Sequence, residues 1–246
     1  MNPTKLELKG SSKIVADYFE FAIHSILFQR GIYPAEDFQT VRKWDLPMLV
    51  NVDDDVKGYV DRVMAQIKKW IYGGRILKLV LVIVGRASGE VVERWEFDIE
   101  AELSLLTSEA KSVNGIINGA SDGTTTATTA TNSNINNGQV AGSTVSASNS
   151  TPKSKLATQR EIQAIIRQIT SLVLYLPILS EDDYTFNVLV YTDPANEASH
   201  IPVEWCDMDG DKKLMDGEVE KVGFAKFSTE MHRVGTMVSY KLNSST

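Results

Sequence analysis

The chain lacks most features that mark secreted, membrane-spanning or nucleic-acid-binding proteins. It carries one cysteine in 246 residues, Cys206, so no disulfide can form within the chain, as is usual in a reducing compartment. No apolar run approaches the roughly 20 residues that a membrane-spanning helix needs, and the N-terminus MNPTKLELKG lacks the apolar core of a signal peptide. The formal net charge is −7 and no basic block occurs, which argues against binding to a phosphate backbone. We expect a soluble, intracellular protein that binds neither nucleic acid nor membrane.

Motifs of catalysis and cofactor binding are also missing. The sequence contains no GxGxxG, GxxxxGK[ST] or GxSxG pattern, so it indicates neither a phosphate loop nor a nucleophile elbow. Its histidines, His24, His200 and His232, lie outside any HExxH motif, and zinc is not supported. The run Asp53-Asp54-Asp55 could suggest a divalent ion, but acidic residues at a helix N-terminus are the simpler explanation. The sequence therefore predicts no catalytic residue, no metal and no cofactor, and it disfavours an enzyme.

The clearest helical pattern runs from Thr158 to Leu176. Thr158 and Glu161 are predicted to form a capping box at its start, and Pro177 to end it. One stripe of the helix is apolar; it comprises Ile162, Ile165, Ile166, Ile169, Leu172, Val173 and Leu176. The opposite side mixes small, charged and aromatic residues, namely Ala164, Arg167, Gln168, Ser171, Leu174 and Tyr175. A helix sandwiched within its own fold and a helix that offers one side to a partner both fit this pattern.

Two further helices are predicted upstream. The first, from about Ser12 to Arg30, is apolar over most of its circumference, which is typical of a buried helix. His24 lies in its narrow polar stripe and is expected to be solvated. The second, from about Asp54 to Tyr72, has one apolar and one charged side and should lie on a surface. Gly31 is placed to end the first helix in a left-handed conformation, and Gly73-Gly74 ends the second.

Strand patterns occupy the middle and the end of the chain. The apolar run from Leu77 to Val84 is expected of a central strand, and the alternating segment from Val91 to Ile99 should pair with it as a hairpin. Tyr184 to Tyr191 is a further strand. Weaker patterns predict strands at Val222 to Ser228 and Thr236 to Leu242. This C-terminal part has no core of its own, so it should pack on the sheet formed by the other strands.

Two segments are predicted to lie outside the packed core. Lys5 to Lys9 alternates charged and apolar residues, which predicts a short strand-like arm of little local stability. From Ser104 to Lys155 the composition shifts to Ser, Thr, Asn, Gly and Ala. Such a tract cannot bury enough apolar surface to offset the entropy lost on ordering. We expect a disordered insertion there.

Motifs spread over nearly the whole chain form one ordered series. They are Ser25 to Phe38, Gly89 to Ile99, Ile166 to Thr170 with Leu176-Pro177, Tyr191 to Asp193, Val203 to Trp205, Phe227 to Thr229, His232 to Val234 and Val238 to Lys241. The series resembles the HORMA-domain family, and within it the spindle-assembly-checkpoint branch of the mitotic-arrest-deficient type. It is less similar to the translesion-polymerase subunit or the meiotic-axis members. Only the insertion falls outside the match, and its content resembles lineage-specific loops of fungal proteins.

The resemblance implies an α+β fold in a single domain, residues 1–246, with three helices packed on a mostly antiparallel sheet. It also implies that residues 194–246 form a mobile segment, which we call the safety belt. In a closed state the belt crosses a bound peptide and lies beside the hairpin strand. In an open state the belt takes the place of the peptide, while the N-terminal arm covers the hairpin edge.

The same resemblance assigns roles to individual residues. A partner peptide would add to the edge strand at Tyr184, Phe186, Val188, Val190 and Tyr191. The belt would act through Trp205, Phe227, His232, Val238, Tyr240 and Lys241. Arg167 and Gln168 match positions that join an open copy to a closed copy, and Leu6 and Leu8 belong to the N-terminal arm.

The function implied is that of a spindle-assembly-checkpoint switch. Expected partners are a coiled-coil kinetochore receptor, the activator of the anaphase-promoting complex, a kinase-like scaffold of the mitotic checkpoint complex, and a second copy of the chain. Capture of the activator would inhibit the complex until chromosomes attach. The expected location is the nucleus, at kinetochores and the nuclear envelope, with a cytoplasmic pool. The alternative is a HORMA adaptor for a DNA-repair polymerase or for meiotic axis assembly.

Overall fold

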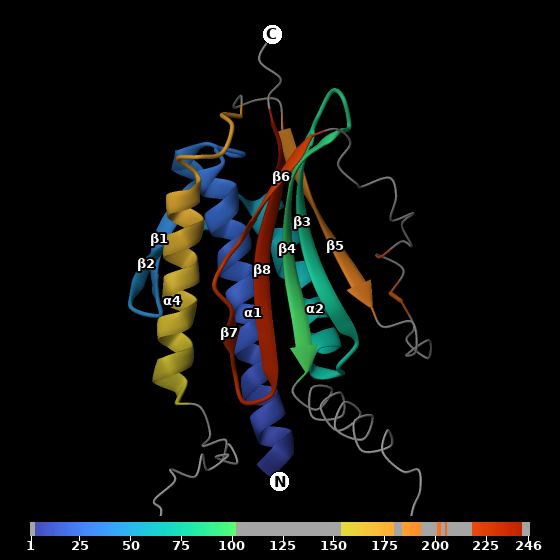
Figure 1. The fold of residues 1–246 in the computed structure, drawn as a ribbon. Coiled ribbons are helices and arrows are strands. Elements are labelled where there is room, and N and C mark those ends of the chain that lie inside the picture. The colour runs from blue at the N-terminus through green and yellow to red at the C-terminus, as the bar shows by residue number, and fades with distance from the viewer. Residues whose placement is uncertain are drawn as a thin grey trace, which may run out of the picture.

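Three helices cover one face of an antiparallel sheet (Figure 1). The computed structural model describes residues 3–101, 154–179, 184–192, 201–202, 205 and 218–242. The helices are α1 (Pro3–Gln29), α2 (Asp54–Tyr72) and α4 (Lys155–Leu172). A short 3-10 turn, η1 (Ala35–Asp37), leads into a separate hairpin of β1 (Phe38–Lys43) and β2 (Leu46–Asn51). In Figure 1 this hairpin lies beside α4, on the side away from the main sheet.

The main sheet has the strand order β5-β3-β4-β8-β6, with β7 also paired to β8. Its strands are β3 (Ile76–Gly85), β4 (Val91–Ala101), β5 (Tyr184–Thr192), β6 (Val219–Gly223), β7 (Phe227–Ser228) and β8 (His232–Lys241). All of these pairings are antiparallel. β5 thus lies on one side of the β3–β4 pair, and β8 and β6 lie on the other, so the C-terminal segment is part of the domain.

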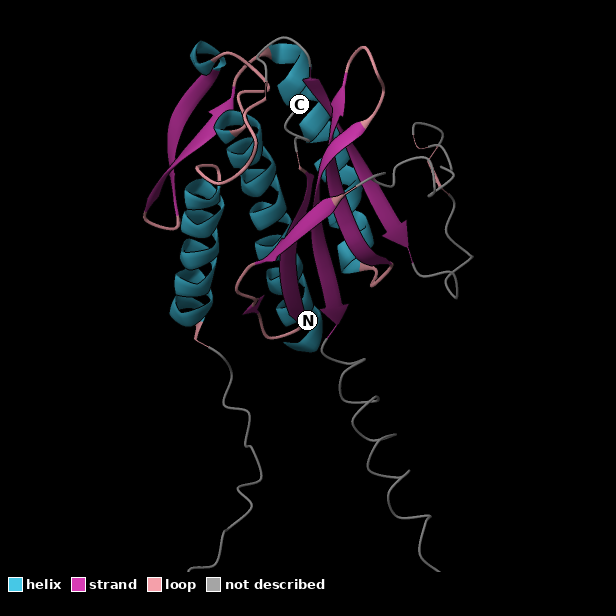
Figure 2. Cartoon of the chain, turned by 45° about the horizontal axis from the view of Figure 1, so that its top comes forward, coloured by secondary structure: helices cyan, strands magenta, loops and turns pink. Residues whose placement is uncertain are grey.

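The core lies between α1 and the sheet, and Figure 2 shows from a second direction how α1 lies against the sheet. α1 passes behind the centre of the sheet with α2 on one side and α4 on the other. Phe19 of α1 lies 5.5 Å, centroid to centroid, from Phe97 of β4. Tyr18 contacts Phe227 of β7 edge-on at 4.8 Å. The long apolar helix predicted from the sequence is therefore the buried centre of the fold.

A second, smaller apolar cluster lies on the other face of the sheet. It comprises Val80, Val82, Val84 and Val91, with Leu189 packed against it. Alternate residues of β3 point to opposite faces, so β3 is buried on both, as its continuous apolar run predicts. The hairpin of β3 and β4 is confirmed by their antiparallel pairing.

Several predicted elements agree closely with the structure. α2 spans Asp54–Tyr72, and Asp53 caps it by accepting hydrogen bonds from the amides of Asp55 and Val56. Gly31 adopts a positive φ of 61° at the end of α1. The C-terminal strands were placed approximately: they occur at β6, β7 and β8, and they pack on the sheet as expected.

Three predictions of local structure were wrong. Leu6 and Leu8 do not form a strand-like arm, because α1 begins at Pro3 and contains both. α4 starts at Lys155, with Ser154 as the cap that accepts from the Leu156 amide. Thr158 and Glu161 lie inside the helix and bond to Ser228 of β7 instead of forming a capping box. At Thr158 and Glu161, hydrogen bonds to a residue distant in the sequence replace the predicted capping box.

Two further differences follow from packing. α4 ends at Leu172, before Pro177. His24 is buried, at 2% exposure, and its Nδ1 accepts a hydrogen bond from the Asn51 amide at 3.3 Å. The β1–β2 hairpin covers this side of α1, which the sequence of α1 alone does not reveal. The predicted insertion from Ser104 to Lys155 lies outside the described residues, except for Ser154 and Lys155 at the start of α4.

Replacing Asp53 by Ala should lower the free energy of unfolding by about 1 kcal/mol, because the α2 cap loses its acceptor. Asp54→Ala is the matched control. Asp54 lies in the first turn and interacts only with the helix dipole, so its loss should cost roughly 0.3 kcal/mol. Urea denaturation of both variants measures the difference, and equal losses would contradict the assignment of the cap.

Candidate partner-binding site

Strand β5 forms one edge of the sheet and is a surface to which a partner strand can add. Among the described strands it pairs only with β3, and the backbone groups of its outer flank are a template for another strand. Charged residues usually protect such edges, yet the nine residues YTFNVLVYT include none. The opposite edge, β6, reads VEKVG and carries one acid and one base. β5 is the edge better suited to accept a strand.

The side chains of β5 alternate as the sequence predicts. Phe186 and Val188 are buried, and Tyr184 and Val190 pack against the same core. Tyr191 is 37% exposed and points to the other face of the sheet. Of the predicted peptide-binding residues, four therefore hold β5 on the core, so pairing with a partner depends mainly on the backbone of this strand.

A hollow of about 230 Å³ lies beside the first half of β5. Its lining comprises Tyr33, Asp55, Val56, Tyr59, Thr185, Phe186 and Asn187. The rings of Tyr33 and Tyr59 contact Phe186 edge-on, with centroid distances of 6.1 and 5.5 Å. Burial raises the pKa of both tyrosine hydroxyls, so they remain neutral near pH 7. A hollow lined by three aromatic rings and by polar groups, next to an open strand edge, can hold a side chain of an added strand.

Strand β8 lies inside the sheet, between β4 and β6. Residues 232–240 of β8 pair with residues 93–101 of β4 without a register shift. The predicted belt residues that are buried here are Phe227, His232, Val238 and Tyr240. The C-terminal segment thus lies beside the hairpin strand, which is the arrangement described above for the closed state. Its buried side chains anchor it to the domain.

The two remaining belt residues mark its other points of attachment. Trp205 packs edge-on against Trp70 of α2 at a centroid distance of 4.8 Å. Lys241 lies 3.5 Å from a carboxylate oxygen of Glu90 in the loop between β3 and β4. β5 and β6 lie at opposite edges of the sheet, so the chain passes from one edge to the other between Thr192 and Val219. The contact with Trp70 places Trp205 near the end of α2, and its backbone amide donates to the Pro202 carbonyl oxygen at 2.9 Å.

Polar groups join α1 to the C-terminal segment. Ser11 Oγ lies 2.6 Å from Nδ1 of His232 and 2.5 Å from Oγ1 of Thr229. The Tyr18 hydroxyl lies 2.8 Å from Oγ1 of Thr236. Burial lowers the pKa of His232 to about 4 and raises that of Tyr18, so both groups are neutral near pH 7. Buried polar groups need such partners, and these contacts therefore fix the register of β8 against α1.

A buried ion pair joins α1 to β4. Nε of Arg30 donates to Oε1 of Glu93 at 2.7 Å, and Nε1 of Trp95 donates to Oε2 at 3.1 Å. Nη2 of Arg30 also donates to the Pro177 carbonyl oxygen at 2.5 Å. Burial raises the pKa of Glu93, and the charge of Arg30 opposes that rise. Sequence reasoning did not find this pair, because its members lie far apart in the chain and no local pattern links them.

The outer side of α4 is exposed next to the C-terminal segment. Arg167 and Gln168, predicted to act in self-association, are both exposed, and Oε1 of Gln168 accepts from the Ala225 amide at 3.1 Å. Three apolar side chains follow the helix with exposures of 85, 78 and 92%; they are Leu174, Tyr175 and Ile178. Such a group of exposed apolar residues is typical of a protein interface. The open question about this helix is thus answered in part: one side is buried in its own fold and the other is free for a partner.

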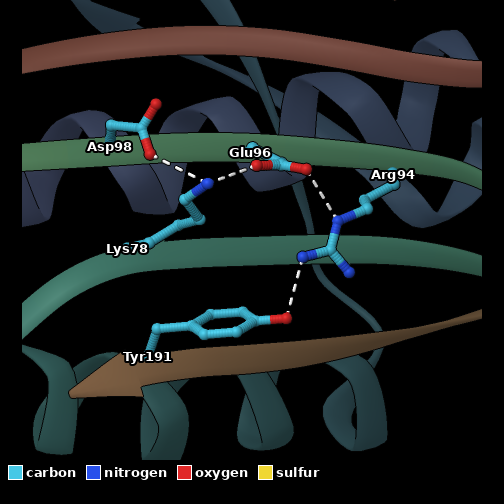
Figure 3. A network of polar contacts seen from close by, with 5 residues as sticks. All are labelled: Lys78, Arg94, Glu96, Asp98 and Tyr191. Carbon is cyan, nitrogen blue, oxygen red and sulfur yellow. Dashed lines mark hydrogen bonds and ion pairs between the residues drawn. The ribbon is translucent and has the colours of Figure 1, made fainter. Parts of the chain in front are cut away.

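Charged side chains form a connected network on the outer face of the sheet (Figure 3). Nζ of Lys78 lies 2.5 Å from Oε2 of Glu96 and 3.1 Å from Oδ1 of Asp98. Nε of Arg94 donates to Oε1 of Glu96 at 2.7 Å, and Nη2 donates to the Tyr191 hydroxyl at 2.8 Å. The pKa of Glu96 is lowered because the hydrogen bonds and charges of Lys78 and Arg94 outweigh its burial. The network therefore stays ionised and spans β4, β3 and β5.

The described residues contain neither a metal-binding cluster nor a helix suited to span a membrane. Within them, no group of three or more His, Cys, Asp or Glu side chains is arranged to hold a metal ion. In the same part of the chain, no helix has the length and apolar character needed to cross a membrane. His200 and Cys206 lie outside the described residues.

Residues 11–232 match the HORMA domain, and the chain belongs to the HORMA-domain family. It is 40% identical to the mitotic spindle checkpoint component mad2 of Schizosaccharomyces pombe, over 98% of this chain and 96% of that protein. It is 36% identical to the human mitotic spindle assembly checkpoint protein MAD2A, over 96% of this chain and 93% of the relative. One chain in the crystal structure of the mitotic checkpoint complex superposes with a TM-score of 0.68 at 38% identity, covering 95% of this chain and 99% of that one. Within the family, these relatives place the chain in the Mad2 branch.

Acidification should destabilise this arrangement through its two buried histidines. Burial lowers the pKa of both His24 and His232 to about 4, against roughly 6.5 in an unfolded chain. Between these values the unfolded chain binds more protons, so stability is complete above pH 6.5 and is lost as the pH falls toward 4. We expect a loss on the order of 2 kcal/mol per histidine, measured by urea denaturation at about pH 7 and pH 4.5.

His232→Gln keeps a polar side chain but removes the titrating group. It should therefore show a smaller loss of stability on acidification than the wild type. An equal loss in both proteins would show that His232 does not contribute.

Proposed function

We propose that this protein is a spindle checkpoint switch that captures a partner segment as an added β-strand on β5. Its relatives in the Mad2 branch are spindle checkpoint proteins, and one structural neighbour is a chain of the mitotic checkpoint complex. The chain functions in the spindle assembly checkpoint and binds partners of the checkpoint complex. Its role is binding and not catalysis.

The position of β8 is the observation that carries the capture mechanism. With β8 paired to β4 in the middle of the sheet, the C-terminal segment does not occupy the outer flank of β5 among the described residues. This flank is nine residues long, uncharged and next to an aromatic hollow. An extended peptide can bind there by β-augmentation, with the backbone giving affinity and the hollow giving selectivity.

The partners and the location follow from this mechanism and from the family. The captured segments would come from the activator of the anaphase-promoting complex and from a coiled-coil kinetochore receptor. Holding the activator, together with the kinase-like scaffold of the checkpoint complex, would inhibit the ubiquitin ligase until chromosomes attach. We propose that the protein acts in the nucleus, at kinetochores and the nuclear envelope, with a cytoplasmic pool.

Partner capture should protect β5 and leave β6 unchanged. Hydrogen exchange with and without an activator-derived peptide should show slower exchange at residues 184–192, because an added strand accepts and donates along that edge. Asn187→Lys places a charge on the edge and should weaken peptide affinity at least about tenfold. Lys221→Asn, on the opposite edge, should bind as the wild type does. Protection at β6, or full affinity of Asn187→Lys, would contradict capture at β5.

The outer side of α4 is the proposed self-association surface. Gln168 and Glu161 each bond to the segment from Ala225 to Ser228, so this side of α4 and the C-terminal segment form one continuous surface. Arg167 gives the surface a positive charge, and Tyr175 follows the end of α4 with its ring exposed. Because the segment joins this surface only when β8 is paired to β4, two copies in different states would present different surfaces to each other.

Arg167→Glu should weaken self-association at least about tenfold, because it reverses the charge at the centre of this surface. Peptide binding at β5 should not change. Arg62→Glu is the matched control, since it makes the same reversal on the exposed side of α2. Analytical ultracentrifugation measures self-association and fluorescence anisotropy measures peptide binding. Normal self-association of Arg167→Glu would refute the assignment.

A further inference from the structure

The edge strand β5 is tied down by arginine side chains at both ends. At its start, Nε of Arg86, in the loop after β3, donates to the Tyr184 carbonyl oxygen at 2.9 Å. At its end, Nη2 of Arg94 donates to the Tyr191 hydroxyl at 2.8 Å. Arg94 belongs to β4 and reaches across β3 to make this bond (Figure 3). The proposed partner-binding strand, β5, is thus held by a side chain of β4, with which it does not pair.

The contact with Tyr191 is stronger than a single exposed hydrogen bond. The guanidinium carbon of Arg94 lies 5.7 Å from the centroid of the Tyr191 ring, close enough for a cation–π attraction as well. Arg94 is buried, at 8% exposure, so solvent competes little for its charge. Hydrogen bonds from a charged donor are also stronger than those between neutral groups.

The rest of the network holds Arg94 in this position. Glu96 accepts from Nε of Arg94 and is itself bound by Lys78, which also contacts Asp98. Two positive and two negative side chains therefore alternate from Asp98 to Arg94. The hydrogen bonds with Tyr191 and Glu96 raise the pKa of Arg94, which keeps its charge fixed. The link to Tyr191 connects the network to β5, outside the β3–β4 hairpin.

Tyr191 is placed where β5 ends. The strand stops one residue later, at Thr192, and the next described strand, β6, lies at the opposite edge of the sheet. Tyr191 also lies directly opposite Lys78 in the pairing of β5 with β3. A tie at this point fixes the end of the edge strand.

We infer that Arg94 and Tyr191 are positioning residues for partner capture, which hold the C-terminal end of β5 in the geometry that an added strand requires. This inference rests on the proposed capture at β5 and adds the residues that make the edge rigid. Without the tie, the end of β5 frays and the captured strand dissociates sooner, while encounter with the open edge is unaffected. The effect should therefore appear in the dissociation rate.

Tyr191→Phe tests the inference because it removes only the hydroxyl. We expect the activator-derived peptide to dissociate about tenfold faster from this variant, the size of effect typical of a hydrogen bond to a charged group. The association rate and the self-association through α4 should not change. Tyr72→Phe, at the end of α2 and outside both β5 and the network, removes a hydroxyl from a tyrosine that is also 37% exposed; it is the matched control and should behave as the wild type does.

A double-mutant cycle with Arg94→Gln separates positioning from general stability. If the two side chains act through each other, the double variant should release peptide no faster than Arg94→Gln alone. Additive effects, or wild-type dissociation from Tyr191→Phe, would overturn the inference. Surface plasmon resonance gives both rates.

Hydrogen exchange in the free protein distinguishes failure of this inference from failure of the proposed function. Exchange at residues 189–192 should be faster in Tyr191→Phe than in the wild type, whether or not peptide is present. If the wild type binds no peptide at β5, the proposed function fails and the inference falls with it. If the wild type binds but exchange at 189–192 is unchanged in the variant, only the positioning role is refuted.

Discussion

The pairing of β8 with β4 is the interaction on which the rest of the structure depends. It places a strand from the last part of the chain in the middle of a sheet whose other central strands come from the first half. It buries Val234 and Val238 against α1, and it holds β8 in the position where β6 and β7 pair with it. It also decides which edge of the sheet stays open. Without this pairing, β4 would itself become an edge and the C-terminal segment would have no core to join.

Two kinds of contact make this pairing specific. Apolar burial supplies most of the free energy but little directional information, whereas buried hydrogen bonds accept only one register. Ser11 and Tyr18, which lie about two turns apart on α1, bond to His232 and Thr236 of β8. The bonds of α4 to Ser228 and Ala225 act in the same way from the other side. Two helices, as well as the sheet, therefore fix the position of the C-terminal segment.

Much of this arrangement could be predicted from the sequence where local pattern and final packing agree. Some local patterns of a few residues match the surroundings of those residues in the fold. They are the apolar stripe of α2, its Asp53 cap and the continuous apolar run of β3. The inward face of β5 was predictable for the same reason. The resemblance to HORMA proteins supplied the placement of the C-terminal segment, which its weak strand patterns could not.

The predictions that were wrong concern residues whose partners lie far away. Thr158 and Glu161 have the spacing of a capping box, but Ser228 binds both. His24 has a polar neighbourhood on its own helix, and the β1–β2 hairpin buries it. Leu6 and Leu8 alternate with charged residues as a strand would, yet α1 extends over them. Local propensity is a weak guide wherever tertiary contacts compete with it.

The uncharged edge of β5 has a consequence for the protein in the absence of a partner. Natural sheets place lysine, proline or a bulge on such flanks to prevent indiscriminate strand pairing, and these nine residues have none of the first two. A copy with no bound partner is therefore prone to pair with unrelated extended segments, including those of other copies. It is prone to aggregate when concentrated. The same open edge that can accept a partner strand therefore lowers the colloidal stability of the protein.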